Sequence, residues 1–273
     1  MTDPTPKHYP SIAQSFGASG IVILGMLMLS PVMITLNNLI GKEASMLIYY
    51  VLAIGIPCWI VFQIRKSETG QASFKLKIEN KRIIPFIILG TIALLWGVIS
   101  PLASTIPMSD EIKKAFMDFG GKTGLYSFVL MVIAAPVLEE ILFRGILLDG
   151  LLKRYSPLKS ILVSSFLFGI VHLNPWQFVT GFVIGIFAGW VYYRTSSLLA
   201  AIIIHASANL NGFLARFFMD ADAAMNDSLV ETWGGTGQLI LAIVGSLVVI
   251  AVCIYYLDKE FKKRKIKVVF DQT

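Results

Sequence analysis

The sequence predicts an all-α, polytopic membrane protein with about eight transmembrane helices. Three observations lead to this fold class: 56% of the 273 residues are hydrophobic, only 15% are charged, and the apolar residues come in long blocks. Soluble domains carry about 25% charged residues, and a block of about 20 apolar residues can span the hydrocarbon core as a helix. Helices are expected throughout, because an open strand edge would leave backbone groups unsatisfied in lipid.

The predicted spans follow one another along the whole chain. The first is expected to be retained rather than cleaved as a signal peptide, because only Lys7 charges its flank and the apolar run is too long. The fourth span is long and the fifth is short. The eight spans are residues 17–36, 45–64, 83–104, 125–152, 158–173, 176–193, 197–218 and 237–257.

The positive charge indicates how the chain is oriented. The net charge is +6, and most basic residues lie in three segments: 65–82, 153–159 and 259–267. With eight spans, these segments fall on the same side as both termini, whereas the loops on the opposite side are acidic or balanced. The positive-inside rule then predicts a multi-pass protein of the cell membrane with both termini in the cytoplasm. The charge is therefore a topology signal, and no nucleic-acid partner is expected.

Two of the connecting segments are expected to have structure of their own. From Phe74 to Ile78, apolar residues alternate with lysines, which predicts a short strand at the inner membrane surface. Residues 105–123 have apolar residues at helical spacing, which predicts an amphipathic helix at the interface. The chain as a whole is divided into N-terminal helices with their loops (1–124), a helical core (125–218), and a last span with a basic tail (219–273).

Polar residues inside the fourth span are the strongest functional signal. Charged groups in a bilayer are costly, so they usually face inward and serve a function. Glu140 and Arg144 are four residues apart and can pair on one helix face, whereas Glu139 points about 100° away. This spacing predicts a structural ion pair that leaves Glu139 available as a general base. Pro136 frees a backbone carbonyl and favours a kink beside the site.

Two later spans also carry polar residues. His172 lies near the end of the fifth span, with Phe168 one turn earlier and able to pack on its ring. His205 and Asn209 place two hydrogen-bonding side chains on one face of the seventh span. Each set alone can be explained by packing or interhelical hydrogen bonds. From the helical rise, Glu139, His172 and Asn209 lie roughly 18–21 Å from the cytoplasmic helix ends and His205 roughly 12 Å, so their depths are compatible with one site.

Three motifs occur in order on these successive helices. They are Glu139-Glu140-x-x-x-Arg144, Phe168-x-x-x-His172 and His205-x-x-x-Asn209. Together they resemble the CAAX protease and bacteriocin-processing family of intramembrane glutamic endopeptidases, over roughly residues 125–212. The first three spans carry no diagnostic motif.

The resemblance implies a role for each motif residue. Glu139 would be the general base that activates water, and His172 would hold and orient that water. His205 and Asn209 would donate hydrogen bonds to the oxyanion of the tetrahedral intermediate. The resemblance implies an endopeptidase without a covalent intermediate and without a cofactor. Three further motif residues would support the site: Glu140, Arg144 and Phe168.

Alternatives remain open on the sequence alone. Glu139, His172 and His205 could instead be three ligands of a zinc ion with water in the fourth position. A different class is a non-proteolytic membrane immunity or regulatory protein, in which the polar cluster is only structural. The expected partners are a peptide or membrane-protein substrate and the lipid bilayer. No feature of the sequence selects a particular substrate, cleavage site or oligomeric state.

Overall fold

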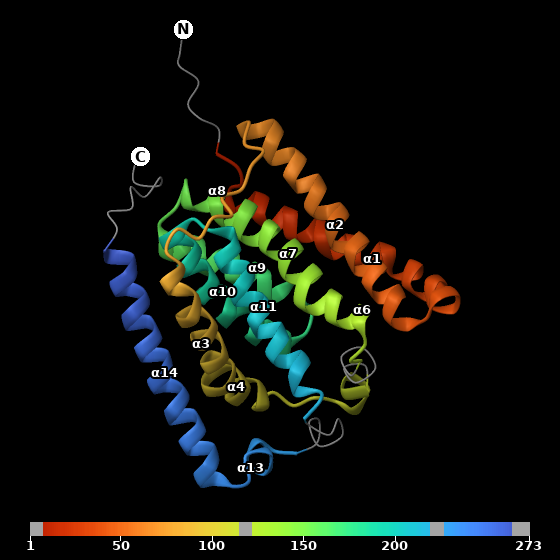
Figure 1. The fold of residues 1–273 in the computed structure, drawn as a ribbon. Coiled ribbons are helices and arrows are strands. Elements are labelled where there is room, and N and C mark those ends of the chain that lie inside the picture. Colours follow the sequence, from red (N-terminus) through yellow and green to blue (C-terminus); the bar gives the residue numbers. More distant parts are fainter. Residues whose placement is uncertain (1–7, 115–121, 219–226, 264–273) are drawn as a thin grey trace.

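The computed structural model describes residues 8–114, 122–218 and 227–263, and within these ranges it is all-α, without a strand. Figure 1 shows the helices as a bundle of roughly parallel and antiparallel rods. Among the described residues, seven helical segments are long and apolar enough to cross a membrane, which confirms the polytopic fold. These segments are Ile12–Ile40, Lys42–Thr69, Lys81–Ser104, Leu125–Leu152, Pro175–Thr195, Leu198–Ala215 and Thr236–Lys262.

The fifth predicted span is shorter than a typical transmembrane helix. It is α9, Pro157–Ile170, with 14 residues, which rise only about 21 Å. Seven of the eight predicted spans therefore have the length of a typical transmembrane helix, and the remaining one, α9, is shorter but still runs between the two ends of the bundle. Just beyond it, the Trp176 indole donates to the Ile106 carbonyl at the end opposite to Pro157. Along its length α9 packs against α10, Pro175–Thr195.

The first two helices form an antiparallel hairpin on one side of the bundle (Figure 1). They are α1, Ile12–Ile40, and α2, Lys42–Thr69. Gly41 alone joins them and has a φ of 81°, a conformation that glycine adopts without the steric cost other residues have. The start of α1 is capped by Ser11 and Gln14, whose side chains bond reciprocally to each other's backbone N–H groups.

The third and fourth spans are irregular helices. The third consists of η1 (Lys81–Ile83), α3 (Ile84–Leu94), η2 (Leu95–Ile99) and α4 (Ser100–Ser104). The fourth consists of α6 (Leu125–Phe128), η3 (Val129–Ala134), α7 (Ala135–Glu140), η4 (Ile141–Leu148) and α8 (Asp149–Leu152). Here η2, η3 and η4 are wider π-helical stretches.

The π-helical stretches η2 and η3 each end two residues before a proline, Pro101 or Pro136. Proline has no N–H to continue an α-helical ladder. The disturbance that the sequence predicts beside Pro136 is therefore a π-helical segment. Such segments are rare and often lie at functional sites.

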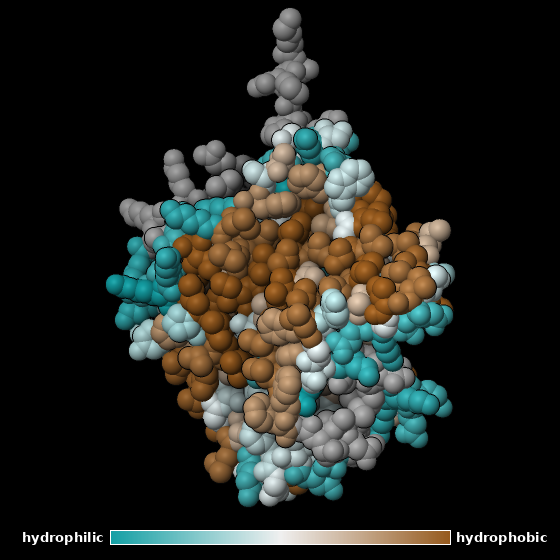
Figure 2. All heavy atoms as spheres, turned by 45° about the vertical axis from the view of Figure 1, so that its right-hand side comes forward, coloured by the Kyte–Doolittle hydropathy of each residue, from teal (hydrophilic) through white to brown (hydrophobic). Residues whose placement is uncertain are grey.

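The remaining helices complete the bundle. Figure 1 shows α9, α10 and α11 (Leu198–Ala215) in the middle, while the blue α14 (Thr236–Lys262) lies along the outside next to α3. A single turn, α13 (Leu229–Thr232), precedes α14. In Figure 2, hydrophobic side chains cover the middle of the visible face and hydrophilic ones gather at its margins, as expected for a surface that contacts lipid.

The segments that carry the basic loops share one end of the bundle. This end contains the start of α1, the end of α2, the turn after α8, the start of α11 and the end of α14. Hydrogen bonds join these segments: Ile12 N–H to the Tyr155 hydroxyl, Arg154 to the His8 carbonyl, Asn80 to Glu260, and Leu198 N–H to the Lys75 carbonyl. The alternation of spans that the charge pattern requires is therefore present.

The prediction of a strand from Phe74 to Ile78 is wrong. This segment pairs with no other strand in the described residues. Instead, the Lys75 carbonyl accepts from Leu198 N–H at 2.8 Å, and the Leu76 carbonyl accepts from the Ser197 hydroxyl at 3.2 Å. Since the first N–H groups of a helix lack partners within it, the segment bonds to the start of α11. Of the predicted interfacial helix, residues 110–114 are helical, and 115–121 lie outside the described residues.

Candidate active site

Glu139 lies at the end of α7 and is buried inside the bundle. Its Oε1 atom accepts a hydrogen bond from the hydroxyl of Tyr50 on α2. Its Oε2 atom is 3.8 Å from Nε2 of His205 on α11. Among the described residues, no group donates a hydrogen bond to Oε2. The two oxygens therefore have different surroundings, since Oε1 already accepts a hydrogen bond and Oε2 accepts none from the described residues.

Glu140 points to a different side and forms the centre of a fully buried polar group. Its Oε1 atom lies 2.9 Å from Nη1 of Arg144 and 3.0 Å from Nδ1 of His205. Both side chains of the Glu140–Arg144 pair are 0% exposed. The contact expected from the four-residue spacing is present, and His205 adds a third member that the spacing does not indicate.

Gly185 on α10 allows another helix to approach this buried guanidinium. A Cβ atom at Gly185 would lie 3.1 Å from Nη2 of Arg144 and 2.9 Å from Cβ of Ser165. A larger residue would therefore push α10 away from α9 or displace the arginine. Gly185 matters here for close packing around a charge, rather than for its backbone freedom.

Phe168 on α9 connects the polar residues of three helices. The guanidinium of Arg144 lies over its ring at 4.4 Å, close enough for a cation–π interaction. The His172 and His205 rings meet it edge-to-face at 5.4 and 5.3 Å. Phe168 is 2% exposed, so it packs the interior of the site and fixes the orientation of both imidazoles.

His172 follows α9 and joins the site through Phe168. Its Nδ1 atom lies 2.8 Å from the Phe168 carbonyl. A carbonyl only accepts, so Nδ1 must be the donor, and in the neutral ring Nε2 is then an acceptor. Among the described residues, no hydrogen bond links His172 to Glu139. The structure brings Glu139 and His205 together directly, and His172 only through the shared phenylalanine.

Asn209 makes a contact that explains the irregular helix before Glu139. Its side-chain N–H donates to the Met131 carbonyl at 2.8 Å. In an α-helix that carbonyl would accept from Ala135, but Ala135 N–H bonds to Leu130 instead. The next candidate is Pro136, which has no N–H. Asn209 therefore satisfies a carbonyl that the proline leaves without a backbone partner, and one of its two N–H groups remains for another acceptor.

Sequence reasoning missed Tyr50. A tyrosine hydroxyl inside an apolar span is a signal, because buried Tyr hydroxyls usually find partners. However, the adjacent Tyr49 carries the same signal, and its hydroxyl donates to the Met26 carbonyl of α1. Only the rotation of α2 against the fourth span shows which of the two tyrosines reaches a carboxylate.

No ready set of metal ligands lies in the described part of the chain, where no group of three or more His, Cys, Asp or Glu residues is arranged to hold an ion. The zinc alternative requires Glu139, His172 and His205 to converge. In the structure, these three side chains are not grouped around one point in the way that a zinc ion requires.

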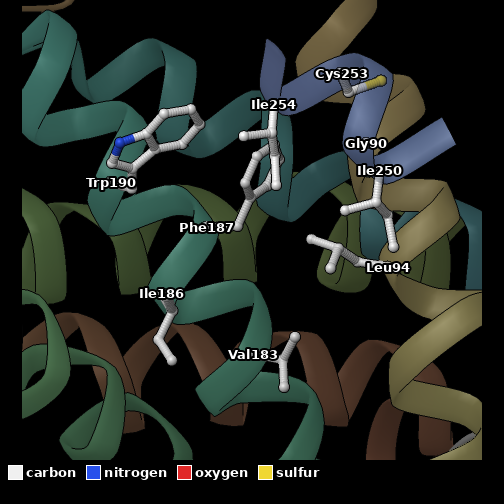
Figure 3. Close-up of a pocket in the computed structure, with 9 residues that line it drawn as sticks. All are labelled: Gly90, Leu94, Val183, Ile186, Phe187, Trp190, Ile250, Cys253 and Ile254. Carbon is white, nitrogen blue, oxygen red and sulfur yellow. The ribbon is translucent and has the colours of Figure 1, made fainter. Parts of the chain in front are cut away.

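A separate apolar groove opens between α3, α10 and α14 (Figure 3). Its volume is about 300 Å³, and its lining includes Leu94, Val183, Phe187 and Ile254. Figure 3 shows hydrocarbon side chains around it, with the sulfur of Cys253 and the indole nitrogen of Trp190 as the only heteroatoms among the drawn side chains. Its lining contains no acid or base, unlike the site around Glu139.

Comparison with known proteins points to the same part of the chain. Residues 121–211 match the family model "Type II CAAX prenyl endopeptidase Rce1-like". The chain is 28% identical over 117 residues to the "Uncharacterized 24.3 kDa protein" of Escherichia coli, an alignment covering 41% of this chain and 54% of that protein. It is 31% identical over 81 residues to the "Putative membrane peptidase YdiL" of Bacillus subtilis (strain 168), covering 30% and 33%.

The matched regions thus span about half or less of these relatives, and no solved structure matches the chain. The family match nevertheless includes all three motifs, from Glu139 to Asn209. The resemblance to the CAAX protease and bacteriocin-processing family is therefore confirmed, and residues 121–211 of this multi-pass membrane protein are similar to a type II CAAX prenyl endopeptidase domain.

Proposed function

We propose that this protein is a membrane-embedded endopeptidase in which Glu139 activates a water molecule. One observation carries the proposal. Within a domain similar to type II CAAX prenyl endopeptidases, Glu139 is a buried carboxylate with one oxygen bound by Tyr50 and the other, Oε2, without a donor among the described residues. A buried polar atom needs a partner, and water is the partner that hydrolysis requires.

The arrangement can perform general-base hydrolysis. Oε2 of Glu139 would accept a proton from water as the oxygen attacks the peptide carbonyl, and the proton would then pass to the leaving amine. Nε2 of His172 would accept from the same water. No serine or cysteine nucleophile is needed, and the tetrahedral intermediate would collapse directly to the two products.

His205 would stabilise the oxyanion, provided that its ring carries two protons. Its Nδ1 atom lies 3.0 Å from Glu140, so Nε2 can donate to an oxyanion only if both nitrogens are protonated. The cluster would then be neutral overall, with two carboxylates, Glu139 and Glu140, balanced by Arg144 and His205. The remaining N–H of Asn209 would be the second donor. Preorganised donors of this kind stabilise such intermediates strongly.

The first substrate class to test follows from the name of the matching family model. A type II CAAX prenyl endopeptidase acts on prenylated C-terminal motifs, so a farnesylated peptide with such a terminus is one probe. Because the resemblance also covers bacterial proteins that process other membrane substrates, the same peptide without the farnesyl group is the second probe. Both would be presented in lipid nanodiscs to the full-length protein.

The decisive experiment compares protein N-termini in host cells that carry either wild type or Glu139→Gln at equal expression. This substitution keeps the side-chain shape and removes the base. Glu79→Gln, in the exposed part of the loop before α3, is the matched control. New termini that appear with wild type and Glu79→Gln, but not with Glu139→Gln, would support proteolysis and identify substrates.

Two results would contradict the proposal. Identical termini in all strains, with Glu139→Gln still restoring a deletion phenotype, would favour a non-catalytic partner. Loss of cleavage on chelation, restored by added zinc, would instead favour a metalloprotease. We expect chelation to leave cleavage unchanged, because the described residues around Glu139 include no group of side chains arranged to hold a metal ion.

A further inference from the structure

Helix α2 reaches the candidate active site although it lies outside the matched residues 121–211. Three contacts along α2 join it to the fourth span. The Tyr50 hydroxyl donates to Glu139, the Cys58 thiol lies 3.9 Å from the Leu138 carbonyl, and Arg65 pairs with Asp149 at 3.4 Å. Helix α2 is therefore held against the Glu139 helix over most of its length.

The contact at Tyr50 differs from the other two because it engages the proposed base. A hydroxyl that donates to a charged carboxylate forms a stronger bond than a neutral pair. With Oε1 engaged, the Glu139 carboxylate cannot rotate freely about its last bond, and Oε2 points towards His205 at 3.8 Å. The hydroxyl thus decides which oxygen faces the space between α7 and α11.

We propose that Tyr50 is a positioning residue, whose hydroxyl holds Oε1 of Glu139 so that Oε2 is the oxygen presented to the attacking water. This inference rests on the proposed function, because it assumes that Glu139 is the base. It also assigns a catalytic purpose to the N-terminal hairpin: α1 and α2 complete a site whose motif residues all lie in the later helices.

The competing explanation is that Tyr50 only attaches α2 to the bundle. The structure makes this explanation testable, because α2 keeps its contacts at Cys58 and Arg65 when the Tyr50 hydroxyl is removed. Tyr49 provides a matched control. Its hydroxyl donates to the Met26 carbonyl at 2.8 Å, so Tyr49→Phe also removes one hydrogen bond of α2, but one whose acceptor is a backbone carbonyl rather than a carboxylate.

The experiment measures kcat and KM for wild type, Tyr50→Phe, Tyr49→Phe and Glu139→Gln in nanodiscs, with whichever of the two peptide probes the wild type cleaves. We expect Tyr50→Phe to lower kcat about 10- to 100-fold, the equivalent of one hydrogen bond to a charged group. We expect KM to stay unchanged, because the proposed role of Tyr50 is to hold Glu139 and not to bind the substrate. Tyr49→Phe should keep the wild-type kcat.

A second measurement reports the contact without relying on cleavage. The infrared difference between wild type and Glu139→Gln isolates the carboxylate band of Glu139, and the same difference is then recorded in the Tyr50→Phe background. A shifted band together with a lower kcat supports the inference. A shifted band with an unchanged kcat, or an unshifted band, overturns it.

Failure of the proposed function gives a different pattern. If Glu139→Gln cleaves as fast as wild type, then Glu139 is not the base, and the positioning role falls with it. The infrared band would still shift in Tyr50→Phe in that case, because the contact would exist without serving catalysis. The two failures are therefore distinguishable.

Discussion

Two interfaces between helices of this protein differ in their chemistry: one is a buried polar cluster and the other is an apolar groove. One interface, the Glu139 cluster, buries four ionisable motif side chains among α2, α7, η4, α9 and α11. Its members are Tyr50, Glu139, Glu140, Arg144, Phe168 and His205. The outer groove between α3, α10 and α14 is lined by hydrocarbon side chains. In lipid, apolar packing alone hardly distinguishes a partner helix from an acyl chain. The comparison teaches that the polar cluster specifies the arrangement of the helices, whereas the groove tolerates variation.

The largest expected difference between the two interfaces is in activity. Glu139→Gln should reduce cleavage by about 100- to 10,000-fold, the usual contribution of a general base. The measurement is the initial rate on the cleaved peptide probe at equal amounts of folded protein. Ile254→Leu in the outer groove keeps the side-chain volume and should cleave like wild type. If Ile254→Leu were as inactive as Glu139→Gln, the outer groove would matter for activity as much as the Glu139 cluster does.

The next largest effect should be on folding. Arg144→Ala leaves Glu140 fully buried without its cationic partner, which costs about 3–5 kcal/mol. Thermal unfolding in detergent and the yield of folded protein measure this loss. Arg194→Ala is the control, because its pair with Asp258 is partly exposed and exposed pairs contribute about 0–1 kcal/mol. Equal stability of the two variants would contradict the importance of the buried pair.

A smaller effect is expected at Asn209. Asn209→Ala leaves the Met131 carbonyl without its donor, which costs about 1–3 kcal/mol of stability. It also removes one proposed oxyanion donor, so cleavage should fall as well. Ser207→Ala is the control, since that hydroxyl bonds only to the Ile203 carbonyl of its own helix. A loss of stability without a loss of kcat would mean that Asn209 only satisfies the Met131 carbonyl and has no part in catalysis.

The smallest effect is expected from repacking the groove. Val183→Ile and Ile254→Leu are conservative exchanges of apolar side chains, and each should change stability by less than about 1.5 kcal/mol. Thermal unfolding of the two single variants and the double variant measures this. A strong loss would mean that α14 is held by specific packing, and the tolerance inferred from the comparison would then apply only to the lipid-facing rim.

The spacing of apolar and polar residues along the sequence predicted much of this molecule, because the length of an apolar run and the helical period strongly constrain a membrane helix. Long apolar runs gave the spans, and a spacing of four residues gave the Glu140–Arg144 contact. What spacing cannot give is the rotation of one helix against another. Tyr50 was therefore missed, and the position of His205 between two glutamates was not predicted.

The errors in the connecting segments have the same physical origin. From Phe74 to Ile78, apolar and charged residues alternate, which is typical of a strand. A strand needs a neighbouring strand to pair with, and the carbonyls of this segment instead accept hydrogen bonds from the start of α11. The short α9 was recognised as the weakest span, and only contacts across the bundle show that it runs from one end to the other. The roles assigned to the motif residues stay predictions until the variants are measured.

The contact between Asn209 and Met131 has a consequence for how substitutions combine. Pro136 creates the unpaired carbonyl, and Asn209 satisfies it from another helix, so the effects of substituting the two residues are linked. With alanine at position 136, the backbone could supply an N–H, and the asparagine would lose its structural task. The cost of Asn209→Ala should therefore be smaller in a Pro136→Ala background. Pro136 and Asn209 therefore form one structural unit, although they lie on different helices and are more than seventy residues apart in the chain.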